Sequence, residues 1–181
     1  KALVSWGGTM FEYLMPLLTM PTFDYTLLDE TYRTVITAQR AWGERNRLPW
    51  GVSESAFYAF DPAMFYQYKA FGIQEIGLKR GLNDDYIVAP YATALAFDLF
   101  PAEAVKNIYY LADEGAMGEY GLYDAIDYTR SRIGKEKSAV IYTYMAHHQG
   151  MIVMALINCL NDKIMQKRLF SYPFMKACEM L

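Results

Sequence analysis

Apolar residues recur along this chain with helical spacing rather than in alternation. From about Thr26 to Arg45 they fall at relative positions 0, 4, 7, 8 and 14, the face of one helix: Leu28, Tyr32, Val35, Ile36 and Trp42. Thr26 followed by Asp29 resembles a capping box with Asp in place of Glu. The pattern therefore predicts a helix that begins near Thr26.

Further helices are predicted in the second half of the chain. Pro101 at a first-turn position and Gly115 at a left-handed cap would bound one of them. Its apolar stripe would consist of Val105, Ile108, Tyr109 and Ala112. The others are expected over Ser138–Leu160, Asp162–Phe170 and Pro173–Leu181.

Long polar and aromatic connections separate these helices, for example Pro49–Arg80 and Gly115–Ile133. Alternating strand patterns are nearly absent. The predicted class is all-α, with long loops that carry the function.

One segment has the length of a membrane span. Residues 138–161 contain no Asp, Glu, Lys or Arg. However, the segment also holds His147, His148, Gln149 and Asn158, each of which is costly in lipid. A helix buried within a larger helical assembly explains the pattern better, so we expect no membrane insertion.

Composition excludes several classes of protein. The 181 residues carry 17 basic and 20 acidic side chains, a net charge of −3 that offers no surface for nucleic acid. High hydrophobicity and low net charge exclude disorder. Cys159 and Cys178 cannot form a disulfide framework, which favours a reducing compartment. Aromatic residues reach 16%, typical of a tyrosine-rich core or of a groove that stacks flat ligands such as sugars.

The two ends of the sequence resemble cuts within a longer polypeptide. Lys1–Val4 has no initiator Met and no signal pattern, and Met180-Leu181 stops within a helical pattern. We therefore expect residues 1–181 to be the C-terminal portion of one domain of a larger protein.

The Pro49–Tyr58 block is the richest candidate for chemistry. Pro and Gly hold Trp50 and Glu54 in a loop, where Trp could stack on a sugar ring and Glu could act as nucleophile or proton carrier. The alternative is a solvated Glu beside a packed Trp.

Two further acidic motifs also have structural alternatives. Glu12 lies among apolar and aromatic residues, so burial could raise its pKa, or it could cap a helix or pair with an Arg. Asp124 and Asp127, flanked by tyrosines, could bind sugar hydroxyls or belong to a surface turn.

The adjacent His147 and His148 do not predict a metal site. Neighbouring helical residues point about 100° apart, and no further His supports them. A neutral, hydrogen-bonded His in a groove is the preferred interpretation. Lys79-Arg80-Gly81 lacks the pattern of a phosphate-binding loop.

Taken together, six blocks resemble the glycoamylase-like domain of bacterial cyclic β-1,2-glucan synthases. In chain order they are Ser5–Pro16, Pro49–Ser55, Tyr66–Gly72, Leu78–Gly81, Val88–Ala92 and Met145–Met151. The resemblance covers essentially all 181 residues.

This resemblance implies part of an (α/α)6 toroid whose N-terminal helices are missing from the chain. It implies retaining transglycosylation that closes linear β-1,2-glucan into a ring, without metal or organic cofactor. The domain would be covalently linked to a membrane-embedded glycosyltransferase and a phosphorylase-like domain, on the cytoplasmic side of the inner membrane.

The resemblance also assigns roles to residues. Glu54 would be the nucleophile, with its acid/base partner upstream of this chain, so the isolated segment is expected to be inactive. Asp124 stands where the family often has Glu, which limits it to substrate binding. The other substrate-binding candidates are Trp50, Tyr58, Tyr66, Tyr68, Tyr91, Glu12, Lys79, Arg80, Asp127, His147, His148 and Gln149.

Two alternatives remain open from the sequence. An endo-β-1,2-glucanase on the same scaffold would transfer the sugar to water instead of a sugar hydroxyl. A non-catalytic spacer domain would bind glucan and pass it to its neighbours.

Overall fold

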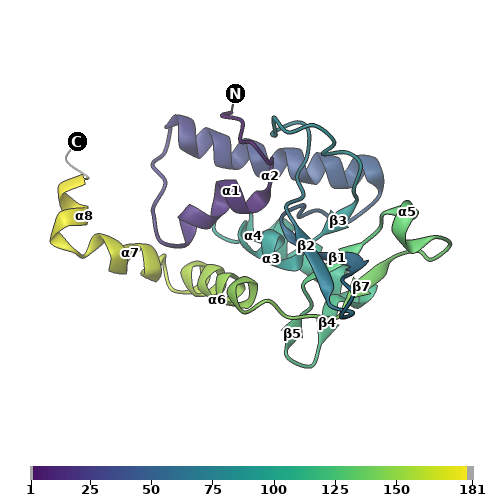
Figure 1. Ribbon diagram of the computed structural model, residues 1–181. Coiled ribbons are helices and arrows are strands. Elements are labelled where there is room, and N and C mark those ends of the chain that lie inside the picture. Colours follow the sequence, from purple (N-terminus) through teal and green to yellow (C-terminus); the bar gives the residue numbers. More distant parts are fainter. Residues whose placement is uncertain (1, 179–181) are drawn as a thin grey trace.

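The computed structural model describes residues 2–178, without the side chain of Cys178. Helices account for more of it than strands do, and three small antiparallel sheets lie on one side (Figure 1). The helices are α1 (Met10–Leu14) with the 3-10 turn Met15–Leu18, α2 (Leu27–Asn46), α3 (Pro90–Ala94), α4 (Pro101–Leu111) with the π turn Ala112–Ala116, α5 (Arg130–Ile133), α6 (Ala146–Leu160), α7 (Ile164–Phe170) and α8 (Pro173–Cys178).

The long helix α2 confirms the first prediction. The Thr26 hydroxyl accepts a hydrogen bond from the Asp29 N–H, as an N-cap should. Tyr32, Val35, Ile36 and Trp42 are buried. Leu28, in contrast, is 51% exposed, so the apolar part of the buried face begins at Tyr32, after the buried Asp29 and Thr31.

Helix α4 also begins at Pro101, but its predicted stripe holds only at Ile108, which is partly buried and packs against the core. Val105 and Tyr109 are exposed, whereas the face toward the core carries Ala104, Asn107 and Leu111. The reason is a buried polar contact. The Asn107 side chain accepts a hydrogen bond from the Trp50 N–H and donates one to the Trp50 carbonyl, which turns Asn107 inward.

The predicted all-α class is corrected by the sheets. Strands β1 (Ser55–Phe60) and β2 (Tyr66–Lys69) pair with each other, β3 (Ile87–Val88), β6 (Ala125–Asp127) and β7 (Ala139–Ile141) form a second sheet, and β4 (Met117–Gly118) pairs with β5 (Gly121–Leu122). These strands are two to six residues long, too short to display an alternating pattern. They lie in the connections that the sequence marks as polar and aromatic.

The charge-free segment 138–161 divides into two elements. Its first residues form β7, and only Ala146–Leu160 is helical, as α6. No helix in the described part of the chain combines the length and apolarity that a membrane span needs. The last helix α8 reaches Cys178, and the predicted continuation to Leu181 lies outside the described residues.

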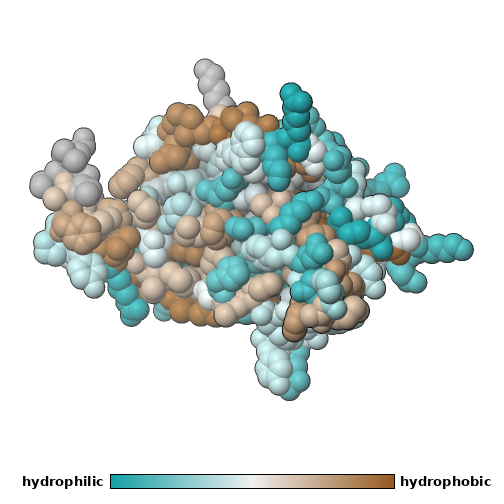
Figure 2. Space-filling view, viewed as in Figure 1, coloured by the Kyte–Doolittle hydropathy of each residue, from teal (hydrophilic) through white to brown (hydrophobic). Residues whose placement is uncertain are grey.

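One apolar core joins α1, α2, α3 and the small sheets. Helix α6 packs on α3 and adds Met151 and Ala155 to this core, and α7 and α8 continue from it toward the C-terminus (Figure 1). Figure 2 shows apolar side chains gathered over the start of α2 and over the C-terminal helices. The exposed apolar residues there include Leu3, Phe23, Leu27, Leu160 and Phe174.

Candidate functional site

A rigid loop, residues 50–55, presents Glu54 to solvent. The Gln39 side chain donates to the Val52 carbonyl at 3.0 Å and accepts from the Val52 N–H at 2.8 Å, entirely within the core. Gly51 adopts φ +120°, and a Cβ there would meet the Thr93 hydroxyl at 2.7 Å. These contacts fix the backbone just before Glu54.

Ser53 and Tyr91 fix the loop from its other side. The Tyr91 hydroxyl lies 2.8 Å from the Ser53 hydroxyl oxygen and 3.0 Å from the Glu54 carbonyl. The Phe11 N–H donates to the same Ser53 oxygen at 3.1 Å. Because the backbone of Glu54 is held on both sides, its side chain projects from a preorganised position.

The Glu54 side chain lines an open cavity of about 440 Å³ together with Phe11, Tyr68, Met145 and His147. Glu54 takes part in none of the ion pairs found among the described residues. A carboxylate without a cationic partner, in a rigid frame with an apolar wall, is suited to attack a bound electrophilic carbon.

Tyr68 is the side chain that connects Glu54 to the interior. Burial raises the pKa of Tyr68, and the charges of Glu54 and Asp124, with a hydrogen bond to Glu54, raise it further. On its other side the Tyr68 hydroxyl lies 3.3 Å from His148 Nε2. The phenol is therefore a hydrogen-bond donor at the edge of the cavity.

The two adjacent histidines have different environments. His148 is buried, with Nδ1 2.6 Å from Asp124 Oδ1, whereas His147 is exposed and faces the Glu54 cavity. Burial and the neighbouring His148 lower the pKa of His147, against opposing effects of Asp124 and Glu54. His147 is thus a neutral hydrogen-bonding group at pH 7. No cluster of metal-ligating side chains occurs in the described part of the chain.

Comparison with known proteins identifies the family. A family model described as Glycoamylase, putative glucoamylase, matches residues 1–173. The chain belongs to this family. It is 42% identical over 181 residues to the cyclic beta-(1,2)-glucan synthase NdvB of Rhizobium meliloti (strain 1021), a match that covers 99% of this chain and 6% of that protein.

Solved structures share the fold of this glycoamylase-family chain. An endo-beta-1,2-glucanase from Chitinophaga pinensis, in complex with sophorotriose and glucose, matches 95% of this chain and 40% of its own with a TM-score of 0.62. A beta-1,2-glucanase from Parabacteroides distasonis matches 94% of this chain and 24% of its own with a TM-score of 0.65. Both are 20% identical to this chain. The chain spans less than half of each relative.

Several predicted substrate-binding residues have structural roles in this family member. Trp50 is 7% exposed and packs in the core, and it lines a cavity other than that of Glu54. Tyr91 is 1% exposed and holds the Glu54 loop. Gln149 donates to the Leu122 carbonyl at 2.8 Å.

Asp124 and Asp127 connect the β1–β2 hairpin to β6. Asp124 accepts from the Ala56 N–H at 2.7 Å and Asp127 from the Tyr58 N–H at 3.1 Å. Asp127 also pairs with Arg132, whose Nε lies 2.7 Å from Oδ2. Both carboxylates are buried, so the interpretation as an exposed turn is wrong for them.

Glu12 caps a helix. The Thr9 hydroxyl accepts from the Glu12 N–H, and the Glu12 carboxylate accepts from the Thr9 N–H in a capping box. Burial by itself would raise the pKa of Glu12, but hydrogen bonds from Thr9, Ser5 and Gly7 outweigh it and lower the pKa. The expectation of a raised pKa is therefore wrong.

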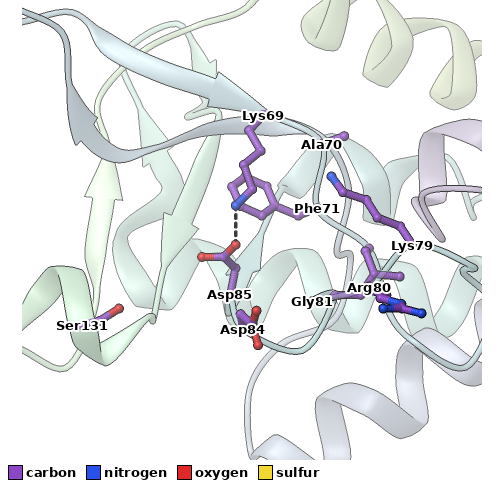
Figure 3. A pocket seen from close by; sticks show the side chains of 11 residues that line it. Lys69, Ala70, Phe71, Lys79, Arg80, Gly81, Asp84, Asp85 and Ser131 are labelled. Atoms are coloured by element: carbon purple, nitrogen blue, oxygen red, sulfur yellow. Dashed lines mark hydrogen bonds and ion pairs between the residues drawn. The ribbon is translucent and has the colours of Figure 1, made fainter.

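Lys79 and Arg80 lie in a different cavity, shown in Figure 3. Its wall includes Lys69, which pairs with Asp85 at 2.6 Å. Lys69 follows Tyr68 on β2, and neighbouring strand residues point to opposite faces. The cavity of Lys79 and the cavity of Glu54 therefore flank opposite faces of β2.

Aromatic residues continue from the Glu54 cavity to a second one. Met145 lines both, and the second, of about 410 Å³, also contains Phe65, Tyr66 and Tyr142. Tyr58 lies further along β1 in edge contact with Phe60. Sequence reasoning included Tyr66 and Tyr58 but missed Phe11, Phe65, Tyr142 and Met145, because only the tertiary fold brings them together.

Proposed function

We propose that this chain is part of a domain that acts on β-1,2-glucan by retaining transglycosylation and closes linear glucan into rings. The supporting observation is Glu54, which has no cationic partner and stands on a rigid loop beside an aromatic-lined cavity. The relative of greatest sequence identity reported above is a cyclic glucan synthase. The proposal includes a toroid, of which this chain would form a part. It also includes the linked glycosyltransferase and phosphorylase-like domains, at the cytoplasmic side of the inner membrane.

The proposed reaction has two balanced steps. The Glu54 carboxylate attacks the anomeric carbon, an ester bond forms, and the glycosidic oxygen leaves with a proton from an acid/base residue upstream of this chain. A hydroxyl at the free end of the same glucan then attacks the anomeric carbon and gives its proton to that residue. The Glu54 carboxylate is released and the ring is closed.

The glucan would extend across the two aromatic cavities joined at Met145. Sugar rings present apolar faces that pack on aromatic side chains, and Tyr66, Tyr68 and His147, which line these cavities, add hydrogen-bonding groups. Tyr58, further along β1, is an additional candidate outside the two cavities. Lys79 and Arg80, on the other side of β2, are left out of this path.

Hydrolysis is the second candidate, because both solved structures reported above are named β-1,2-glucanases. The same Glu54 chemistry with water as acceptor would give shorter linear products. Mass spectrometry separates the two, since ring closure yields products one water lighter than linear chains of equal length.

The test uses Glu54→Gln in the full-length protein that contains this sequence, supplied with linear β-1,2-glucan. We expect at least a 10³-fold loss of turnover with glucan binding retained. Glu136→Gln, the same change at an exposed turn, should leave turnover unchanged. Ring formation at the wild-type rate by Glu54→Gln would contradict the proposal and support the spacer alternative. Inversion at the anomeric carbon would contradict the nucleophile assignment.

A further inference from the structure

An enclosed carboxylate–imidazole pair lies behind the Glu54 cavity. His148 and Asp124 have side chains that are 1% and 0% exposed, and His148 Nδ1 lies 2.6 Å from Asp124 Oδ1. At this burial neither side chain can contact a sugar in the cavity. Their interaction therefore requires an explanation other than substrate binding.

The hydrogen bonds define the orientation of the imidazole. Asp124 Oδ2 already accepts from the Ala56 N–H, and an ionised carboxylate only accepts, so His148 Nδ1 carries the hydrogen toward Oδ1. The Tyr91 ring stacks on the imidazole at 3.7 Å and 11°. This stacking fixes the ring plane, and Nε2 is thereby directed at the Tyr68 hydroxyl.

The Tyr68 hydroxyl has one hydrogen and lies beside two acceptors: His148 Nε2 at 3.3 Å, and the carboxylate of Glu54, which lines the same cavity. A neutral His148 offers Nε2 as an acceptor, and the phenol then donates to the ring. When His148 carries a second proton, Nε2–H donates to the phenol oxygen, and the phenol hydrogen is free for the Glu54 carboxylate. A hydrogen bond from Tyr68 to Glu54 therefore belongs to the second arrangement, in which the Asp124 carboxylate balances the charge of the imidazolium.

We propose that Asp124 and His148 are positioning residues that direct the Tyr68 hydroxyl, and that Tyr68 is a further catalytic residue that hydrogen-bonds the Glu54 carboxylate. The inference rests on the proposed function of Glu54. A donor on one carboxylate oxygen leaves the other free for attack. It also stabilises the carboxylate when the glycosyl ester breaks in the second step.

Few charged groups surround Asp124, His148 and Tyr68, so a pH dependence of turnover can be assigned to them. Glu54 comes from the loop before β1, Asp124 from the turn before β6, Tyr91 from α3, and His147 and His148 from α6. Among the described residues that line the Glu54 cavity there is no Lys or Arg.

The test starts with Tyr68→Phe in the full-length protein. Tyr68 is 40% exposed, so removal of its hydroxyl should leave the fold intact. We expect kcat to fall about 10- to 100-fold with KM within about twofold, because a hydrogen bond to a charged group is lost. The acidic limb of the pH–rate profile should move to higher pH, since the carboxylate loses a donor. Tyr25→Phe, the same change at a tyrosine that is 97% exposed and lines neither cavity, is the matched control.

A double-mutant cycle separates positioning from general stability. If Asp124 acts through Tyr68, Asp124→Asn should lower kcat in the wild-type background and add little to Tyr68→Phe. Thermal unfolding verifies that each variant is folded, and if Asp124→Asn is not, Tyr68→Phe alone decides the role of the phenol. Wild-type kcat and pH profile in Tyr68→Phe would overturn the inference, as would additive losses in the cycle.

The inference and the proposed function can fail separately. Retained ring formation in Glu54→Gln would refute the proposed function. Loss of turnover in Glu54→Gln, combined with unchanged kinetics in Tyr68→Phe, would refute only the role of Tyr68.

Discussion

Two loops rich in candidate residues have opposite designs. The loop 50–55 is enclosed by the core, and hydrogen bonds from Gln39, Asn107 and Tyr91 hold its backbone. The loop 78–85 is mostly exposed, and its carboxylate Asp85 is taken up by Lys69 and Arg132. In the first loop the structure restrains the backbone and leaves one carboxylate without a cation. In the second, charge is used to hold the fold together.

Removal of Arg132 should give the largest effect on stability. Its guanidinium pairs with Asp85 at 2.5 Å and with the fully buried Asp127 at 2.7 Å. Arg132→Met would leave a buried charge uncompensated, and we expect a loss of about 3–5 kcal/mol in the free energy of unfolding. Denaturant titration measures the loss. Arg130→Met, two residues away and exposed, should cost less than about 0.5 kcal/mol.

The same carboxylates should make stability depend on pH. Although burial opposes it, Lys69 and Arg132 lower the pKa of Asp85 below its ordinary 3.8. A group whose pKa is lower in the folded state stabilises the fold at pH values above its pKa in the unfolded state. That contribution is lost as the pH falls through its pKa in the folded state. The pKa of Glu12 is likewise lowered, from its ordinary value of 4.5. We therefore expect the free energy of unfolding to fall as the pH drops below about 4.5. In Arg132→Met this fall should be smaller. A wild-type protein equally stable at pH 5 and pH 3 would contradict this account.

Loosening the Glu54 loop should affect both stability and turnover. Gln39→Leu leaves the Val52 N–H without a partner in the core, at a cost of about 1–3 kcal/mol, whereas the Val52 carbonyl still accepts from the Met10 N–H. We expect kcat to fall more than about tenfold as Glu54 loses its fixed position. Gln74→Leu, an exposed glutamine, is the control for both measurements. Unchanged kcat in a destabilised Gln39→Leu would show that loop rigidity is not needed.

The second aromatic cavity should give a smaller effect, confined to binding. Tyr142 is 67% exposed and lines the cavity that adjoins Glu54 at Met145. Tyr142→Ala should weaken glucan binding by about 1 kcal/mol, or about fivefold, without a change in stability. Titration with glucans of increasing length measures it, and the difference from wild type should grow with chain length. A length-independent result would remove this cavity from the glucan path.

The smallest effect is expected from Lys79 and Arg80. Both are exposed and lie across β2 from the Glu54 cavity. Lys79→Ala and Arg80→Ala should leave kcat and KM within twofold of wild type. A strong loss of turnover in either variant would extend the site to the cavity shown in Figure 3.

Predictions from the sequence succeeded where the deciding interactions are local and failed where they join residues far apart in the chain. Helix α2 and its Thr26 cap were predicted because both depend on residues within four positions of one another. The apolar face of α4 was predicted incorrectly because a contact 57 residues away, between Asn107 and Trp50, decides it. Strands β6 and β7 were missed because short strands depend on their partners rather than on their own pattern.

The same division applies to the site. Sequence motifs were sufficient to select Glu54, Tyr68, His148 and Asp124 as candidates and to indicate the family. Only the tertiary structure separated a cavity-lining Tyr68 from a buried Tyr91, and a solvent-facing His147 from a buried His148. Residue type and local spacing determine which chemistry a chain can carry. Burial and long-range hydrogen bonds decide which groups retain a free face for that chemistry, because these depend on residues far apart in the sequence.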